Sequence, residues 1–184
     1  MATQVEICNY ALGLIGAEPI SSIGENTREA KSCVNFYDLV KLNLLRSHNW
    51  NFAIKRATVT GITNSTFEFK YKIQKPTDYL RIVSFYDYTG EFKEEEGYIL
   101  LNQQTVKLKY VNKNVTEANF DSSFSVCLGS KLAETICYQI TQSATLLQMI
   151  KQTHKEDLAQ ARRNNAISNS ADSFQEPTWL TTRL

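Results

Sequence analysis

Residues 47–57 read SHNWNFAIKRA, and this stretch lies where the sequence pattern changes from helical to strand-like. Trp50 and Phe52 stand two positions apart and are followed by Lys55 and Arg56. The aromatic rings could form a stacking platform for single-stranded nucleic acid, with the basic pair holding phosphates. Alternatively, the rings fill a buried junction between two parts of one fold, as large aromatic side chains commonly do.

The residues before this stretch predict two helices joined by a short connection. Thr3 and Glu6 form a capping box for the first helix, which Gly16 ends. We expect Asn26 to cap the second helix, with Glu29 three residues later. The predicted buried stripe of the second helix consists of Ala30, Cys33, Tyr37, Val40 and Leu44.

From about residue 57 the apolar residues alternate with polar ones, which predicts strands. The clearest case is FEFKYKIQ at 67–74, where Phe67, Phe69, Tyr71 and Ile73 would share one face. The segments LRIVSFY, GYILL and TVKLKYV repeat the signal and are separated by turn residues and by the acidic run at 94–96, which we expect to be a solvated loop. The middle third therefore predicts an antiparallel meander of four to six strands.

The last third returns to a helical period between about residues 120 and 171, with Ser143 as the cap of its second half. The final residues, DSFQEPTWLTTRL, have no period but keep large apolar side chains. These predicted anchors are Phe174, Trp179, Leu180 and Leu184. Apolar anchors on an aperiodic tail predict an extended arm that binds a surface outside the subunit.

Together these patterns predict an α+β fold, in which a helical bundle carries an inserted antiparallel β-sheet and an extended C-terminal arm. The predicted parts are the N-terminal helices at 1–50, the β region at 51–118, the C-terminal helices at 119–170 and the arm at 171–184. In this arrangement Trp50 and Phe52 lie where helix meets sheet, so we favour the junction over the stacking platform.

Composition argues against several classes of function. Lys plus Arg total 20 and Asp plus Glu total 19, so the net charge of +1 creates no general attraction for a polyanion. The two histidines, His48 and His154, belong to no catalytic motif; we expect His48 at a helix end in a favourable charged form and His154 on an exposed helix face. The four cysteines are expected to be buried and reduced. We therefore predict no catalytic, metal or cofactor site, and no segment long enough to span a membrane.

Four lysines keep a nucleic-acid hypothesis open. Lys70 and Lys72 alternate with core residues on one predicted strand, and Lys107 and Lys109 do so on another. If these strands are neighbours, the lysines form a basic sheet face that the net charge hides. A solvated face with edge-protecting lysines is the other interpretation. The alternative function is thus a small nucleic-acid-binding module that uses this face.

The series of motifs resembles one protein family. In order, the chain carries ICNYALGLIGAEPI, WNFAIKRA, KPTDYLRI, KYVNKNVTEANFDSSF and LAETICYQIT. This order is similar to that of the tail tubular protein A family, the head-to-tail adaptors of short-tailed bacteriophages (podoviruses). Its most specific pieces are WNFA at 50–53 and PTDYLR at 76–81, so Pro76, Asp78 and Arg81 are expected at the same junction as Trp50 and Phe52. Lys75, Ser122 and Gln142 depart from the family pattern, and Gln142 stands where a glycine is common.

The resemblance implies a structural protein of the virion neck, assembled in the host cytoplasm. Adaptor subunits form a homo-oligomeric ring, typically of twelve copies, beneath the portal protein. A tail nozzle or tail tube protein lies below the ring, and double-stranded DNA passes through its channel; neither a cofactor nor a membrane is involved. We expect the C-terminal arm to contact the portal or a neighbouring adaptor.

Overall fold

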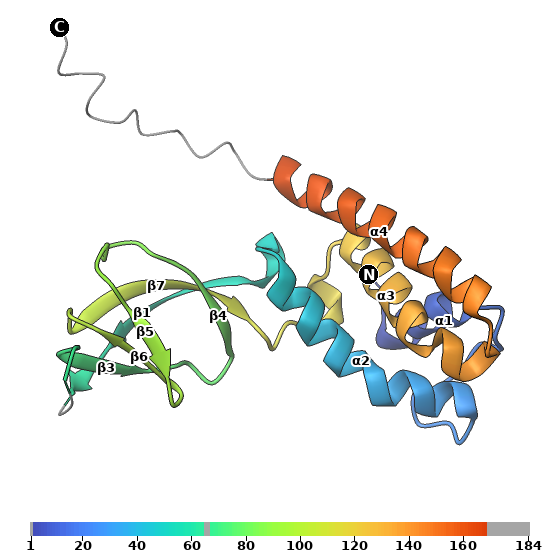
Figure 1. Cartoon of the computed structure of the whole chain (residues 1–184), viewed down its shortest axis with the longest axis horizontal. Helices are drawn as coiled ribbons and strands as arrows, with labels where there is room; N and C mark the ends of the chain where they lie inside the picture. The colour runs from blue at the N-terminus through green and yellow to red at the C-terminus, as the bar shows by residue number, and fades with distance from the viewer. Residues whose placement is uncertain (1, 65–66, 169–184) are drawn as a thin grey trace, which may run out of the picture.

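The computed structural model describes residues 2–64 and 67–168. This part of the chain has the predicted α+β fold, with four α-helices and two antiparallel sheets. Figure 1 shows that the helices gather at one end of the molecule and the strands at the other, and that α2 runs toward the β region. The chain crosses between the two parts once after α2 and once before α3.

Each helix begins at a side-chain cap, and the sequence predicts two of the four caps correctly. Their bounds are α1 (Gln4–Leu14), α2 (Arg28–Ser47), α3 (Ser122–Thr141) and α4 (Ala144–Ile167). Thr3 and Ser143 cap α1 and α4 as expected, and Asp121 caps α3. The expected cap of α2 is wrong by one residue: Thr27, not Asn26, accepts the hydrogen bond from the Ala30 N–H, at 3.2 Å. The Thr27 hydroxyl lies three residues before Ala30, which is the spacing this bond requires.

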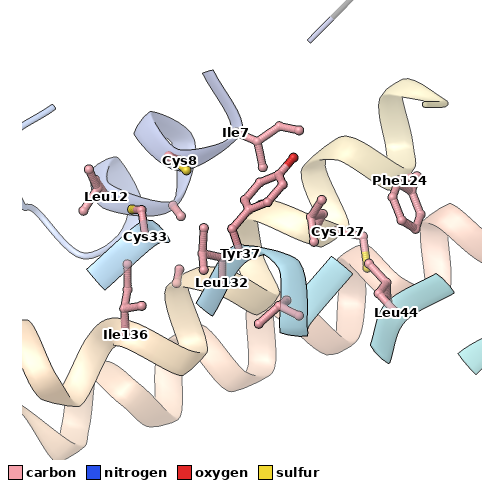
Figure 2. Packing of buried hydrophobic residues seen from close by; sticks show 14 of the residues in the cluster. Ile7, Cys8, Leu12, Cys33, Tyr37, Leu44, Phe124, Cys127, Leu132 and Ile136 are labelled. Atoms are coloured by element: carbon pink, nitrogen blue, oxygen red, sulfur yellow. The ribbon is translucent and has the colours of Figure 1, made fainter. Parts of the chain in front are cut away.

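The helical core is built around α3, which contacts each of the other helices. Figure 2 shows apolar side chains of α1, α2 and α3 packed between these helices, with Tyr37 among them. The four cysteines are buried and unpaired by disulfides, as predicted. At Gly129 a Cβ atom would lie 2.5 Å from the ring of Tyr10, so α3 needs a glycine where it approaches α1.

The strands form two antiparallel sheets rather than one meander, so that prediction is wrong. Their bounds are β1 (Ile54–Thr60), β2 (Ile62–Thr63), β3 (Tyr71–Gln74), β4 (Tyr79–Phe85), β5 (Lys93–Glu95), β6 (Tyr98–Leu101) and β7 (Thr105–Asn112). The first sheet has the order β1-β7-β4 and the second the order β2-β3-β6-β5. The last strand thus enters between the first and fourth, a long-range pairing that local periodicity does not encode.

β7 takes part in both hydrophobic cores. Val106, Leu108 and Tyr110 project into the core of the β region, while Val111 packs into the core of the helices. Successive side chains of a strand point to opposite faces, so one strand can serve two cores. The sheet β1-β7-β4 is consequently joined to the helical part by apolar contact as well as by the chain.

The predicted strand at 67–74 is only half present. Phe67 is 86% exposed, Phe69 is buried, and regular pairing begins at Tyr71. Glu68 has a positive φ of 72°, which turns the chain and breaks the alternation. The acidic run at 94–96 is likewise not a simple loop, because Glu94 and Glu95 belong to β5.

Gln142 provides a test of the α3–α4 connection. It adopts a left-handed conformation with φ 54°, and its N–H donates to the Tyr138 carbonyl at 3.0 Å. A non-glycine residue in the left-handed conformation destabilises the folded state by about 1 to 2 kcal/mol. Glycine avoids this strain, but it lowers stability by about 0.4 to 1 kcal/mol because it makes the unfolded chain more flexible. Gln142→Gly should therefore raise the free energy of unfolding in urea by up to about 1 kcal/mol. Gln142→Ala, which keeps the strain, should show no gain; an equal gain would contradict this account.

Candidate interaction surfaces

Trp50 is the central residue of the helix-to-sheet junction. Its side chain is 1% exposed, its indole Nε1 donates to the Leu44 carbonyl at 2.9 Å, and its ring packs edge-on against Phe124 of α3. Phe52 lies half-buried in the same cluster and packs against Phe120 and Phe124. A base cannot stack on Trp50 without unfolding this region, so the stacking platform is excluded for this ring.

Hydrogen bonds hold the end of α2 against β4 and α4. The Arg81 Nε donates to the Arg46 carbonyl at 2.8 Å, and Arg46 Nη1 donates to the Leu80 carbonyl at 3.0 Å. From α4, the Asn165 side chain accepts from the Asn51 N–H at 2.8 Å. Arg81 of PTDYLR and Asn51 of WNFA thus lie at one junction with distinct partners.

The PTDYLR motif supplies a second set of junction contacts. The Pro76 carbonyl accepts from the Tyr79 N–H at 3.0 Å, which closes a turn before β4. Asp78 follows in this turn and accepts from Lys55 Nζ at 2.6 Å and from the Tyr110 hydroxyl at 2.9 Å. Burial disfavours the charged carboxylate of Asp78, but these two hydrogen bonds outweigh it and lower its pKa. Lys55 is thereby neutralised locally.

The histidines occupy structural positions, one of which differs from expectation. His48 ends α2 as predicted, but burial, Arg162 and Arg81 lower its pKa, so the expected stabilisation of its charged form is wrong. His154 is buried rather than exposed, and its Nδ1 lies 3.3 Å from Ser130 Oγ. The polar sequence HKED at 154–157 does not indicate this burial, because packing against α3 decides which face of α4 is covered.

A Cys–His contact that the sequence did not suggest lies between α3 and α4. Cys127 Sγ is 4.0 Å from His154 Nδ1. Burial and then the charge of Asp157 raise the pKa of Cys127 to about 12, and the thiol is 0% exposed. A protonated, inaccessible thiol is not a nucleophile, so this contact is part of the core.

The four predicted lysines do not form one basic face. Lys72 lies on β3, which pairs with β2 and β6, whereas Lys107 and Lys109 lie on β7 in the other sheet. Lys70 precedes β3, and its N–H donates to Asn102. The condition for a shared basic face, that these two strands are neighbours, is therefore not met.

Arg56 instead completes a basic groove with Lys107 and Lys109. On the outer face of β1-β7-β4, Arg56 and Ser84 both pair with Lys109, and Thr58 pairs with Lys107. The resulting cavity of about 580 Å³ is also lined by Ala57, Phe85, Tyr86 and Leu108. Sequence reasoning noted Arg56 as part of a basic pair but missed this partnership; the alternation of β1 was the signal.

The helical part carries an exposed apolar row on α2. Leu39 is 66% exposed, and Val34 and Leu42 are 45% and 36% exposed. Leu39 and Leu42 stand three positions apart and so share one face of the helix, and Val34 lies about two turns before Leu42. Apolar residues gathered in this way are typical of contact surfaces.

The predicted C-terminal anchors lie outside the part of the chain that the structure describes. Phe174, Trp179, Leu180 and Leu184, together with the whole arm at 171–184, lie outside the described residues. Within the described ranges, no group of His, Cys, Asp or Glu side chains is arranged to hold a metal ion. Nor does any helix of these ranges have the length and hydropathy of a membrane span.

No protein-family model matches the chain, and no curated protein matches it significantly.

The burial of Trp50 predicts a large loss of stability on truncation. Trp50→Ala removes the indole hydrogen bond and leaves a cavity, which should lower the free energy of unfolding by about 3 to 5 kcal/mol. Phe67→Ala is a matched control because Phe67 is 86% exposed, and it should stay within about 0.5 kcal/mol of the wild type. Urea unfolding followed by circular dichroism measures both. Equal effects would show that Trp50 is no anchor.

Asp78 predicts a pH-dependent contribution to stability. Its folded pKa lies below the unfolded value of about 3.9, so the stabilisation is present above that value and is lost as pH falls through the folded pKa. Asp78→Asn should therefore destabilise the protein at pH 7, and the difference from wild type should shrink below about pH 4. Urea midpoints measured between pH 7 and pH 3 test this. A constant difference would contradict it.

Proposed function

We propose that the protein is a head-to-tail adaptor of a short-tailed bacteriophage, which forms a ring between the portal protein and the tail. The observation that carries this proposal is the meeting of its two most specific motif segments. Arg81 from PTDYLR bonds Arg46 at the end of α2 and Asn49 just after it. Asn51 from WNFA, 30 positions earlier, bonds Asn165 of α4, which in turn donates to the Asn49 carbonyl. Each motif thus has a structural reason to occur with the other.

Surface chemistry supports a conduit rather than a DNA-gripping module. The net charge is +1, and the lysines that would have formed a broad basic face lie on separate sheets. Strong DNA binding requires many phosphate contacts, each of which releases counterions. A nearly neutral ring can surround moving DNA without holding it, so passage through the channel is compatible with this surface.

The two ends of the subunit suit different contacts. The apolar row of α2 is available to a neighbouring subunit or to the portal. The arm at 171–184, with its Trp and Phe, is our proposed portal or neighbour contact. The β region would face the tail nozzle or tail tube protein. The role proposed is structural, without catalysis or a cofactor, and its location is the virion neck after assembly in the host cytoplasm.

The adaptor function predicts an added layer on a portal ring. Negative-stain imaging of purified protein mixed with the candidate portal should show a symmetric extra tier, whose copy number gives that of the ring. Deleting residues 171–184 should remove the tier, because one aromatic anchor contributes about 2 kcal/mol and the ring repeats it.

A second variant separates the effect of the apolar anchors from the effect of the length of the arm. Replacing Phe174, Trp179 and Leu180 by alanine keeps the arm and should also remove the tier. No tier with folded wild-type protein would overturn the adaptor function. A normal tier from both variants would leave the ring but refute the role of the arm.

A further inference from the structure

The basic groove carries positive charge that its own subunit does not neutralise. Among the described residues, Arg56, Lys107 and Lys109 form no ion pair. Lys107 lies over the ring of Tyr86, which is itself 85% exposed, and the nearby Asp87 carboxylate accepts the Lys107 backbone N–H at 2.8 Å. Three cations therefore surround a cavity whose lining contains no carboxylate.

An acidic hairpin elsewhere in the β region carries negative charge that its own subunit does not fully neutralise. β5 lies at the edge of its sheet and connects to β6 through Glu96 and Gly97, both with positive φ. Glu94 is paired with Lys75 at 2.9 Å, but Glu91, Glu95 and Glu96 are exposed and form no ion pair in the described part of the chain. Because their side chains are exposed, these three carboxylates are accessible to another molecule, and the unpaired edge of β5 lies beside them.

We propose that the acidic hairpin at 91–96 of one subunit occupies the basic groove of the next subunit. The hairpin and the groove belong to different sheets, and no ion pair joins them within the described part of one subunit, so mutual neutralisation requires a second copy. Lys93 also belongs to the hairpin but is paired with Glu68 at 2.6 Å, so the three carboxylates without an ion pair leave an acidic surface that complements the three cations of the groove. Because the two surfaces differ, the contact is heterologous, and repeated heterologous contacts close a ring when their rotation permits.

A nucleic-acid backbone is the competing occupant of the groove. The second copy is favoured because the chain itself supplies a matching set of charges, which leaves the whole subunit nearly neutral. The cavity of about 580 Å³ also has the scale of a few side chains rather than of a duplex. Exposed ion pairs are individually weak and are screened by salt, so the contact should act through its repetition in a ring and weaken as salt rises.

Charge reversal tests this contact in the full-length protein. The groove variant carries Lys107→Glu and Lys109→Glu, and the hairpin variant carries Glu95→Lys and Glu96→Lys. In wild type, a zero-length carbodiimide should cross-link these lysines to these glutamates between subunits, which an isotopically mixed sample identifies by mass spectrometry. Each variant alone should lose these cross-links and associate at least tenfold more weakly in low-salt sedimentation.

Mixing the two variants provides the decisive comparison. The groove variant offers an acidic groove and an acidic hairpin, while the hairpin variant offers basic ones, so every contact between unlike subunits is complementary. The mixture should therefore regain association. Lys70→Glu with Lys72→Glu makes the same charge change in and just before β3 of the other sheet, and this variant should associate like wild type. Circular dichroism verifies that each variant is folded.

Several outcomes would overturn the contact. They are a wild type without these intersubunit cross-links, a mixture that fails to associate, or a groove variant that keeps its association but loses salt-sensitive binding to a DNA duplex. The last result would assign the groove to nucleic acid. The inference rests on the proposed ring, yet the two fail separately: normal portal tiers from both variants refute only the contact, and the absence of a wild-type tier refutes the adaptor function.

Discussion

The burial of Trp50 is the constraint on which the arrangement of the two parts depends. Its indole N–H is bonded to a carbonyl in the last turns of α2, and its ring is packed against α3. The chain leaving α2 is therefore held close to the bundle until it enters β1. Asn51 and Phe52 then have neighbours on α4 and α3, so the direction of the first strand is set by contacts on both sides.

Arg81 extends this constraint to a strand that is distant in sequence. Its guanidinium bonds the carbonyl of Arg46, while the guanidinium of Arg46 bonds the carbonyl of Leu80. Two like charges can lie at one junction because each donates to backbone oxygens, and the planar fork of arginine suits several such acceptors. Together with the packing of Val111 into the helical core, this exchange makes the β region an anchored part rather than a tethered one.

The nearly neutral net charge conceals a segregated surface. Several ion pairs, such as that of Lys55 and Asp78, neutralise charged side chains within the subunit. The remaining cations of the groove and carboxylates of the hairpin are kept on different sheets. In the proposed ring such separation would orient neighbouring copies, because complementary charge disfavours wrong contacts more than it adds affinity.

The sequence by itself determined the helices, the caps of α1 and α4, the position of the junction and the α+β class. These depend on interactions within a few residues, such as the capping box of Thr3 and Glu6, and on the change of period after Trp50. Only the tertiary structure decided that β7 enters between β1 and β4, that His154 is buried, and that Arg56 rather than Lys70 or Lys72 joins Lys107 and Lys109. Strand pairing and the choice of covered helix face depend on contacts between residues far apart in the chain. Local periodicity shows which residues share a face, but it does not show which element packs against that face.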